Sequence, residues 1–167
     1  MNDNFEIERK YIIKMPDFEA LRKKSDRIIE ITQAYIGQDE NGFNCRLRKT
    51  VENGKTCFIF TAKKKISDIK RIENEYYIEE AEYNELLKKR LSQRNIIHKT
   101  RYCVNENGFT YEIDIYPFWQ NQAVMEVELA DEKIIPPRLD FIDIIKEVTF
   151  EKGYSNFALS KAIPDEV

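Results

Sequence analysis

Charged side chains recur at every second position along most of the segments that resemble β-strands. In "FEIERKYII" (residues 5–13), Glu6, Glu8 and Lys10 point to one face, because side chains at i and i+2 of a strand share a face. Apolar residues stand between them, so such a strand has a charged face and an apolar face. The pattern returns at Arg46 and Arg48, at Arg71, Glu73 and Glu75, at Lys99 and Arg101, at Glu112 and Asp114, and at Glu126 and Glu128.

Two arrangements accommodate a sheet that is charged on one face and apolar on the other. A flat sheet turns its charged face to water, as most alternating strands do. A sheet that curls into a barrel turns its apolar face outward beneath helices and keeps its charged face inside. Basic and acidic pairs are sorted strand by strand here. This sorting favours the barrel, because opposite charges in an interior compensate one another.

Turn residues separate the strand candidates. "DENG" (39–42), "ENGK" (52–55) and "ENG" (106–108) lie between runs rich in Val, Ile, Tyr, Phe and Thr, which is typical of antiparallel hairpins. We expect helices where apolar residues follow helical spacing, over 16–28 and 79–93, and a third over 138–147, after Pro136-Pro137. We expect strands over 5–13, 32–37, 43–49, 56–63, 71–78, 97–103, 109–116 and 123–129.

Composition limits the class of protein. The 167 residues suit a single domain, expected over 1–167. With 27 basic and 30 acidic residues, the net charge of −3 gives no overall attraction to nucleic acid or to a membrane surface. The start, "MNDNFEIERK", lacks an apolar secretory segment, and no run approaches the roughly 18 apolar residues of a membrane span. We therefore expect a cytoplasmic protein with no nucleic-acid or membrane partner, and a homodimer stays open.

Cysteine and histidine are too sparse for several common kinds of site. Cys45, Cys57 and Cys103 show no CxxC spacing, so we expect packing residues rather than a disulfide framework or a thiolate metal site. His98 is the only histidine, which argues against a His-rich metal site and a Ser/His/Asp triad. By strand parity with Lys99, its side chain should point away from a barrel interior.

Arg and Lys side chains that converge inside a barrel would bind a polyanion. The guanidinium fork matches phosphate oxygens, and the ammonium group acts as a point charge. Carboxylates beside a phosphate repel it unless a cation intervenes, and Glu and Asp oxygens without His or Cys suit a hard divalent cation such as Mg²⁺ or Mn²⁺. The two sets together predict a metal-dependent site for phosphoryl transfer.

The segment "EIERK" (Glu6, Glu8 and Lys10) matches the ExExK signature of the CYTH or triphosphate tunnel metalloenzyme superfamily. Further blocks resemble this superfamily in order, over essentially the whole chain: "QAYI" (33–36), "CRLRK" (45–49), "FTAK" (60–63), "RIENEYYI" (71–78), "HKTRY" (98–102), "YEIDIY" (111–116), "MEVELADE" (125–132) and "KEVTFEKGYSNFALS" (146–160). The resemblance implies an α+β fold, an eight-stranded antiparallel closed β-barrel with helices packed outside, enclosing a tunnel that binds triphosphate.

The resemblance also implies roles for individual residues. The implied phosphate ligands are Lys10, Arg46, Arg48, Lys63, Lys99 and Arg101. The implied principal ligands of Mg²⁺ or Mn²⁺ are Glu6, Glu8 and Glu128, while Glu73, Glu75, Asp114 and Glu126 are similar to acidic residues that hold a second cation or orient the nucleophilic water. Within these sets, Glu6, Glu8, Lys10 and Lys99 are implied to be catalytic.

The implied reaction is hydrolysis of inorganic triphosphate to diphosphate and phosphate, because "KTRY" and "EVE" accompany this activity in the small bacterial members that the chain most resembles. Alternatives are an adenylyl cyclase of the CYTH kind, a nucleoside or thiamine triphosphatase, and, third, a non-catalytic polyphosphate-binding module. The chain departs from the superfamily at Arg138-Leu139-Asp140, in place of Trp-Leu-Gly, and at Lys64, in place of Gly. Both departures are expected near the tunnel mouth, where substrate choice is made.

Other residues are expected to have structural roles. The lysines within 64–70 should belong to a solvated hairpin. Tyr154 should cap one end of the barrel rather than assist proton transfer. Phe118 and Trp119 should pack within their own loop rather than stack on a base or a thiazole ring.

Overall fold

The computed structural model describes residues 5–167. Residues 1–4, which belong to the start that argued against a secretory segment, lie outside the described residues. The strands are β1 (Phe5–Lys14), β2 (Arg27–Gln38), β3 (Asn44–Glu52), β4 (Lys55–Lys65), β5 (Lys70–Ile78), β6 (Ile97–Glu106), β7 (Phe109–Ile115), β8 (Gln122–Glu128) and β9 (Ile144–Glu147). The helices are α1 (Phe18–Lys24), α2 (Glu80–Leu87), the 3₁₀-helix η1 (Lys152–Tyr154) and α3 (Asn156–Leu159).

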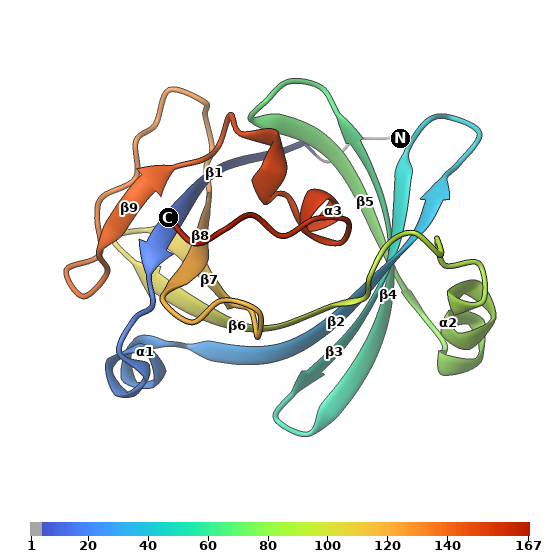
Figure 1. Ribbon diagram of the computed structural model, residues 1–167, viewed down its shortest axis with the longest axis horizontal. Helices are drawn as coiled ribbons and strands as arrows, with labels where there is room; N and C mark the ends of the chain where they lie inside the picture. Colours follow the sequence, from blue (N-terminus) through green and yellow to red (C-terminus); the bar gives the residue numbers. More distant parts are fainter. Residues whose placement is uncertain (1–4) are drawn as a thin grey trace.

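The strands close into a barrel through β1. The order in the sheet is β5-β4-β3-β2-β6-β7-β8-β1-β9, and β1 also pairs with β5, so that eight antiparallel strands form a ring and β9 is added beside β1 (Figure 1). Residues 5–7 of β1 pair with β5, whereas residues 8–14 pair with β8. The expected eight-stranded antiparallel closed barrel is confirmed.

Two of the expected turns close tight hairpins. Asn53-Gly54 joins β3 to β4 and Asn107-Gly108 joins β6 to β7, with all four residues at positive φ. Asn and Gly tolerate this conformation, whose twist matches that of the flanking strands. The hairpins therefore form where these dipeptides interrupt the alternating pattern.

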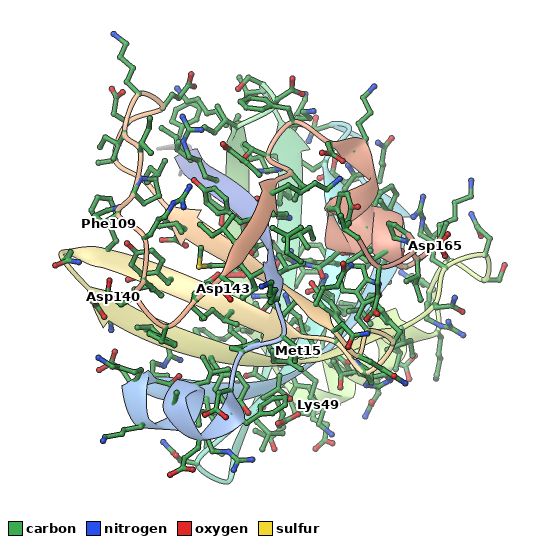
Figure 2. The ribbon with its side chains drawn as sticks, turned by 60° about the vertical axis from the view of Figure 1, so that its left-hand side comes forward. Met15, Lys49, Phe109, Asp140, Asp143 and Asp165 are labelled. Atoms are coloured by element: carbon green, nitrogen blue, oxygen red, sulfur yellow. The ribbon has the colours of Figure 1, made fainter. Side chains whose placement is uncertain are left out.

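The apolar face of the barrel points outward, and α1 and the β8–β9 loop pack against it to form a core on the outside of the barrel. Leu21 of α1 and Leu139 and Ile142 of the loop pack with strand residues that include Ile113 and Met125, all buried. The Tyr111 hydroxyl donates to the Pro137 carbonyl at 2.7 Å and ties the loop to the sheet. Figure 2 shows this loop, which carries Asp140, crossing the outside of the β6–β7 hairpin.

A second apolar cluster closes one end of the barrel interior. Ile12, Ile97 and Val124 continue the interior faces that carry Lys10, Lys99 and Glu126, and they pack with the C-terminal segment. In Figure 1, α3 lies within the outline of the strand ring, whereas α1 and α2 lie outside it. The interior is therefore charged over one part of its length and apolar at its end.

Three expected helices differ from the structure. The helix expected over 16–28 ends at Lys24, where Ser25 caps it, and Ile28 belongs to β2; the helix expected over 79–93 ends at Leu87. The helix expected over 138–147 is wrong, because this segment is a loop followed by β9. Since β5 covers only residues 5–7 of β1, the edge at residues 11–13 is open, and β9 satisfies its backbone groups.

Within residues 5–167, we find no helix with the length and apolar character that crossing a bilayer requires. The described cysteines are all free: Cys45 and Cys103 are buried and Cys57 is half-buried. The side chain of His98 is exposed and lies beside Thr32 on the outer face, as strand parity predicts.

Candidate active site

The charged faces of the strands surround a cavity of about 590 Å³. Its lining comes from β1 to β8 and from the C-terminal segment around η1 and α3. Eleven of the thirteen residues to which the sequence assigned a role in the site contribute to it: Glu6, Glu8, Lys10, Arg46, Arg48, Lys63, Glu73, Glu75, Arg101, Glu126 and Glu128. Lys99 and Asp114 do not line the cavity; they lie beneath it, with side chains 0% exposed.

The ExExK residues face the acidic residues of β8. Strand register places Glu8 opposite Glu128 and Lys10 opposite Glu126. The Lys10 Nζ atom lies 2.8 Å from a Glu126 carboxylate oxygen, and both side chains are buried. Although burial opposes the charge, Glu126 and Glu8 raise the pKa of Lys10, and Lys10 is therefore held as an ammonium.

Beneath the cavity, Asp114 joins two cations. Its carboxylate accepts hydrogen bonds from Lys99 Nζ at 2.5 Å and from Nε and Nη2 of Arg101, both at 2.7 Å. Arg101 also contacts Glu112 and lies 3.0 Å from Glu126, which places its guanidinium at the cavity surface. Burial, followed by the charge of Arg101, lowers the pKa of Lys99 to about 8.

Lys63 on β4 joins two carboxylates: Glu73 on the neighbouring strand β5, and Glu6 on β1, which lies on the far side of β5. Its Nζ atom lies 2.6 Å from both Glu6 and Glu73, and Arg46 adds a contact of 3.1 Å to Glu73. Burial and the neighbouring charges of Glu8 and Glu73 raise the pKa of Glu6 to about 8, whereas Lys63 and Arg46 overcome the burial of Glu73 and lower its pKa to about 2. The negative charge of the pair therefore resides on Glu73 near neutral pH.

Arg48 differs from the other cations in the cavity. Among the described residues no carboxylate forms an ion pair with it, and its guanidinium donates only to the Gln33 side-chain oxygen, at 3.4 and 3.3 Å. Burial, and then repulsion from Arg46 and Arg101, lowers the pKa of Arg48 to about 10. A bound anion would relieve this repulsion, so Arg48 is poised to receive one.

The carboxylates suit a divalent cation by their chemistry. Glu8 and Glu128 face each other directly, an arrangement that like charges disfavour unless a cation joins them. Glu128 has no ion pair within residues 5–167, and burial together with Glu8 raises its pKa. Glu8, in contrast, is bound to Arg71 at 2.7 Å. No three described Asp, Glu, His or Cys side chains are clustered as a metal site, so a cation would have to compete with existing ion pairs.

Sequence reasoning left several residues of this region without a role. Arg71 binds Glu8. Its period-two spacing with Glu73 is the sequence pattern that places its side chain on the interior face. Gln33 and Tyr35 share the interior face of β2 and carry no such charge signal. Phe150 and Phe157 line the cavity from the C-terminal segment, which local pattern does not place against a strand.

The residues expected to be structural lie outside the cavity, with one exception. Trp119 packs against Tyr116 and Phe118, and its Nε1 donates to the Pro164 carbonyl at 3.1 Å. Tyr154 belongs to the apolar cluster at the closed end, as expected for a cap. Lys65 is the exception: it lines the cavity, with a side chain that is more than half exposed.

The two departures from the superfamily pattern do not both lie at the mouth. Leu139 is buried in the outer core, so the expectation for Arg138-Leu139-Asp140 is wrong; the loop packs against the apolar outside of β6 and β7. Lys64 lies at the same end of β4 as Lys63, but on the outer face, where it donates to the Asn41 carbonyl at 3.2 Å.

Comparison with known proteins finds similarity along nearly the whole chain. The inorganic triphosphatase of Acetivibrio thermocellus is 32% identical over 158 residues, which cover 93% of each chain. The crystal structure of the inorganic triphosphatase NE1496 is 26% identical with a TM-score of 0.56, covering 96% of this chain and 97% of the other. The PH1819 protein from Pyrococcus horikoshii OT3 shares the fold, with a TM-score of 0.56, 23% identity, and coverage of 77% and 80%. No model of a protein family matches the chain.

Proposed function

This chain belongs to the CYTH or triphosphate tunnel metalloenzyme superfamily, and we propose that it hydrolyses inorganic triphosphate to diphosphate and phosphate in its charged cavity. The observation that carries the proposal is the convergence of basic and acidic side chains from the barrel strands on one cavity of about 590 Å³. Two relatives that span nearly its full length carry the name inorganic triphosphatase, which supports the same activity.

In this proposal, the cations at the cavity surface bind the phosphate chain. Arg48 is available to the substrate without breaking an ion pair, because no carboxylate of residues 5–167 is paired with it. Lys10, Arg46, Lys63 and Arg101 exchange part of their carboxylate contacts for phosphate oxygens. Lys99 acts from beneath: it holds Asp114, which in turn fixes the guanidinium of Arg101.

The acidic residues supply the ligands for a divalent cation, Mg²⁺ or Mn²⁺. Glu6, Glu8 and Glu128 would hold it, since they offer only oxygen atoms. The cation, when bound, supplies positive charge to the phosphate oxygens and acidifies a bound water. Of the further acidic residues, Glu73, Glu75 and Glu126 line the cavity, and Asp114 lies beneath it. Buried cations engage Glu126 and Asp114, and we assign these two to positioning.

The test is a direct assay of the purified chain. Triphosphate, ATP and thiamine triphosphate are offered with Mg²⁺ or Mn²⁺ and with a chelator, and phosphate release and cyclic AMP are measured. We expect preference for triphosphate and loss of activity with the chelator. Glu6→Gln and Lys10→Ala should lower turnover by orders of magnitude, whereas His98→Ala, on the outer face, should not. Formation of cyclic AMP from ATP as the main activity would overturn the proposal.

One feature favours an organic triphosphate as a second substrate. Phe150 lines the cavity and is 61% exposed, so its ring offers a stacking surface beside the phosphate-binding groups. If ATP or thiamine triphosphate is hydrolysed, Phe150→Ala should weaken that activity without changing hydrolysis of inorganic triphosphate.

The cytoplasmic location, the single domain and a homodimer remain predictions from the sequence.

A further inference from the structure

Gln33 is a fully buried polar side chain on the interior face of β2. It does not line the cavity, but it connects two residues that do. Its Nε2 atom donates to the Tyr35 hydroxyl at 2.6 Å, and its Oε1 atom accepts from Nε and Nη2 of Arg48 at 3.4 and 3.3 Å. Both ends of a buried amide are thus engaged by groups of the candidate site.

The chemistry of these partners determines the direction of each hydrogen bond. A guanidinium only donates, so the amide oxygen of Gln33 must face Arg48 and the amide nitrogen must face Tyr35. The nitrogen only donates, so the Tyr35 oxygen must accept. The proton of the Tyr35 hydroxyl is therefore directed elsewhere, and Tyr35, only 5% exposed, meets the cavity.

We propose that Gln33 is a positioning residue of the triphosphatase: it fixes the Arg48 guanidinium and orients Tyr35 so that its O–H donates to a phosphate oxygen of the substrate. This inference rests on the function proposed above. Tyr35 keeps its proton at neutral pH, because burial raises its pKa. The ring is held in place by an edge contact with Phe157, at a centroid distance of 5.1 Å, so the hydroxyl has a defined position.

A double-mutant cycle tests the inference. Tyr35→Phe should lower kcat about 10- to 100-fold, the range for a hydrogen bond to a charged group. In a Gln33→Glu background, the carboxylate accepts the Tyr35 proton, so adding Tyr35→Phe should change kcat less than about twofold. Gln33→Glu also places a carboxylate beside Arg48 and should raise KM. If the Glu variant does not fold, Gln33→Leu provides the same cycle, because leucine cannot donate to the Tyr35 hydroxyl and so does not fix the direction of its O–H bond.

Gln122→Leu is the matched control. Gln122 is also buried inside the barrel, but its Oε1 atom accepts from the backbone N–H of Val167, away from the cavity. Because neither Gln122 nor Val167 lines the cavity, this variant should leave kcat and KM unchanged. Equal effects of Tyr35→Phe in the wild type and in both Gln33 backgrounds would overturn the inference, as would wild-type kinetics for Tyr35→Phe.

The outcome also separates this inference from the proposed function. If the wild type does not hydrolyse triphosphate, the proposed function fails, and the same cycle is measured on triphosphate affinity by calorimetry. A loss of affinity from Tyr35→Phe that vanishes in the Gln33→Glu background would still support the orientation of the hydroxyl. If the wild type neither hydrolyses nor binds triphosphate, both proposals are wrong.

Discussion

Replacement of Asp114 by Asn should be one of the most destabilising single changes in the barrel interior. The carboxylate is fully buried and contacts Lys99 at 2.5 Å and Arg101 at 2.7 Å through two nitrogens. An amide carries no charge and turns an N–H₂ group toward at least one of these cations. Arg101 would keep its contacts with Glu126 and Glu112, whereas Lys99 would lose the one carboxylate with which it forms an ion pair among the described residues. Breaking a buried pair in this way costs about 3–5 kcal/mol.

This loss can be measured by thermal and denaturant unfolding. For a chain of this size, each kcal/mol shifts the melting temperature by about 2–4 °C, so we expect a decrease of about 6–20 °C. Asp68→Asn is the control, because Asp68 pairs with Lys65 at 2.6 Å while both side chains are more than half exposed. Exposed pairs contribute about 0–1 kcal/mol. A loss below 1 kcal/mol for Asp114→Asn would refute the view that this network is desolvated.

The same network predicts how stability depends on pH. Although burial favours the neutral acid, Arg101 and Lys99 lower the pKa of Asp114 below its usual value of 3.8. A carboxyl whose folded pKa is lowered stabilises the protein above the unfolded pKa, and this contribution is lost as the pH falls through the folded value. The difference in unfolding free energy between wild type and Asp114→Asn should therefore shrink below about pH 4.

Two further variants separate stability from activity. The pKa of Glu6 is raised from 4.5 to about 8, so the folded chain loses stability as the pH rises between these values. At pH 9, Glu6→Gln should therefore melt at a higher temperature than wild type. The same variant should lose orders of magnitude in turnover. Leu139 is buried in the outer core, so Leu139→Ala should cost about 2–5 kcal/mol in unfolding free energy. Its kcat at a temperature where the variant is folded should equal that of wild type, because the loop lies outside the cavity.

The parts of the fold that the sequence predicted depend on local geometry. Period-two spacing assigns Glu6, Glu8 and Lys10 to one face without knowledge of any partner strand. The Asn-Gly dipeptides at Asn53 and Asn107 define hairpins because their positive φ angles set the twist. The same parity places His98 outside.

The parts of the fold and of the site that the sequence did not predict depend on contacts between distant segments. The strand β9 forms because β5 leaves part of the β1 edge unpaired. No pattern within 138–147 reveals this unpaired edge. Parity assigns Lys99 to the interior but says nothing of its depth, which follows from how strands are staggered around the ring. Gln33 carries no charge, so only its contacts with Tyr35 and Arg48 identify it.

The charge balance of the cavity bears on how substrate and metal bind. Within residues 5–167, eight Lys or Arg and nine Asp or Glu side chains line it, so the net charge of these residues does not by itself favour a polyanion. A cation bound at the carboxylates would release basic side chains such as Arg71 from their ion pairs and make the cavity attractive to phosphate. Triphosphate and Mg²⁺ should therefore strengthen each other's binding, by the same factor in both directions.

Calorimetry with a non-hydrolysable triphosphate analogue can measure this coupling. We expect Mg²⁺ to tighten binding about 5- to 150-fold, the range of typical coupling energies. Glu128→Gln is the matched variant, because Glu128 has no ion pair among the described residues and its loss leaves the basic groups paired as before. Metal and analogue also associate in solution, but equally for both proteins, so the difference between them reports the cavity alone. Equal coupling in wild type and Glu128→Gln would show that this carboxylate does not hold the cation.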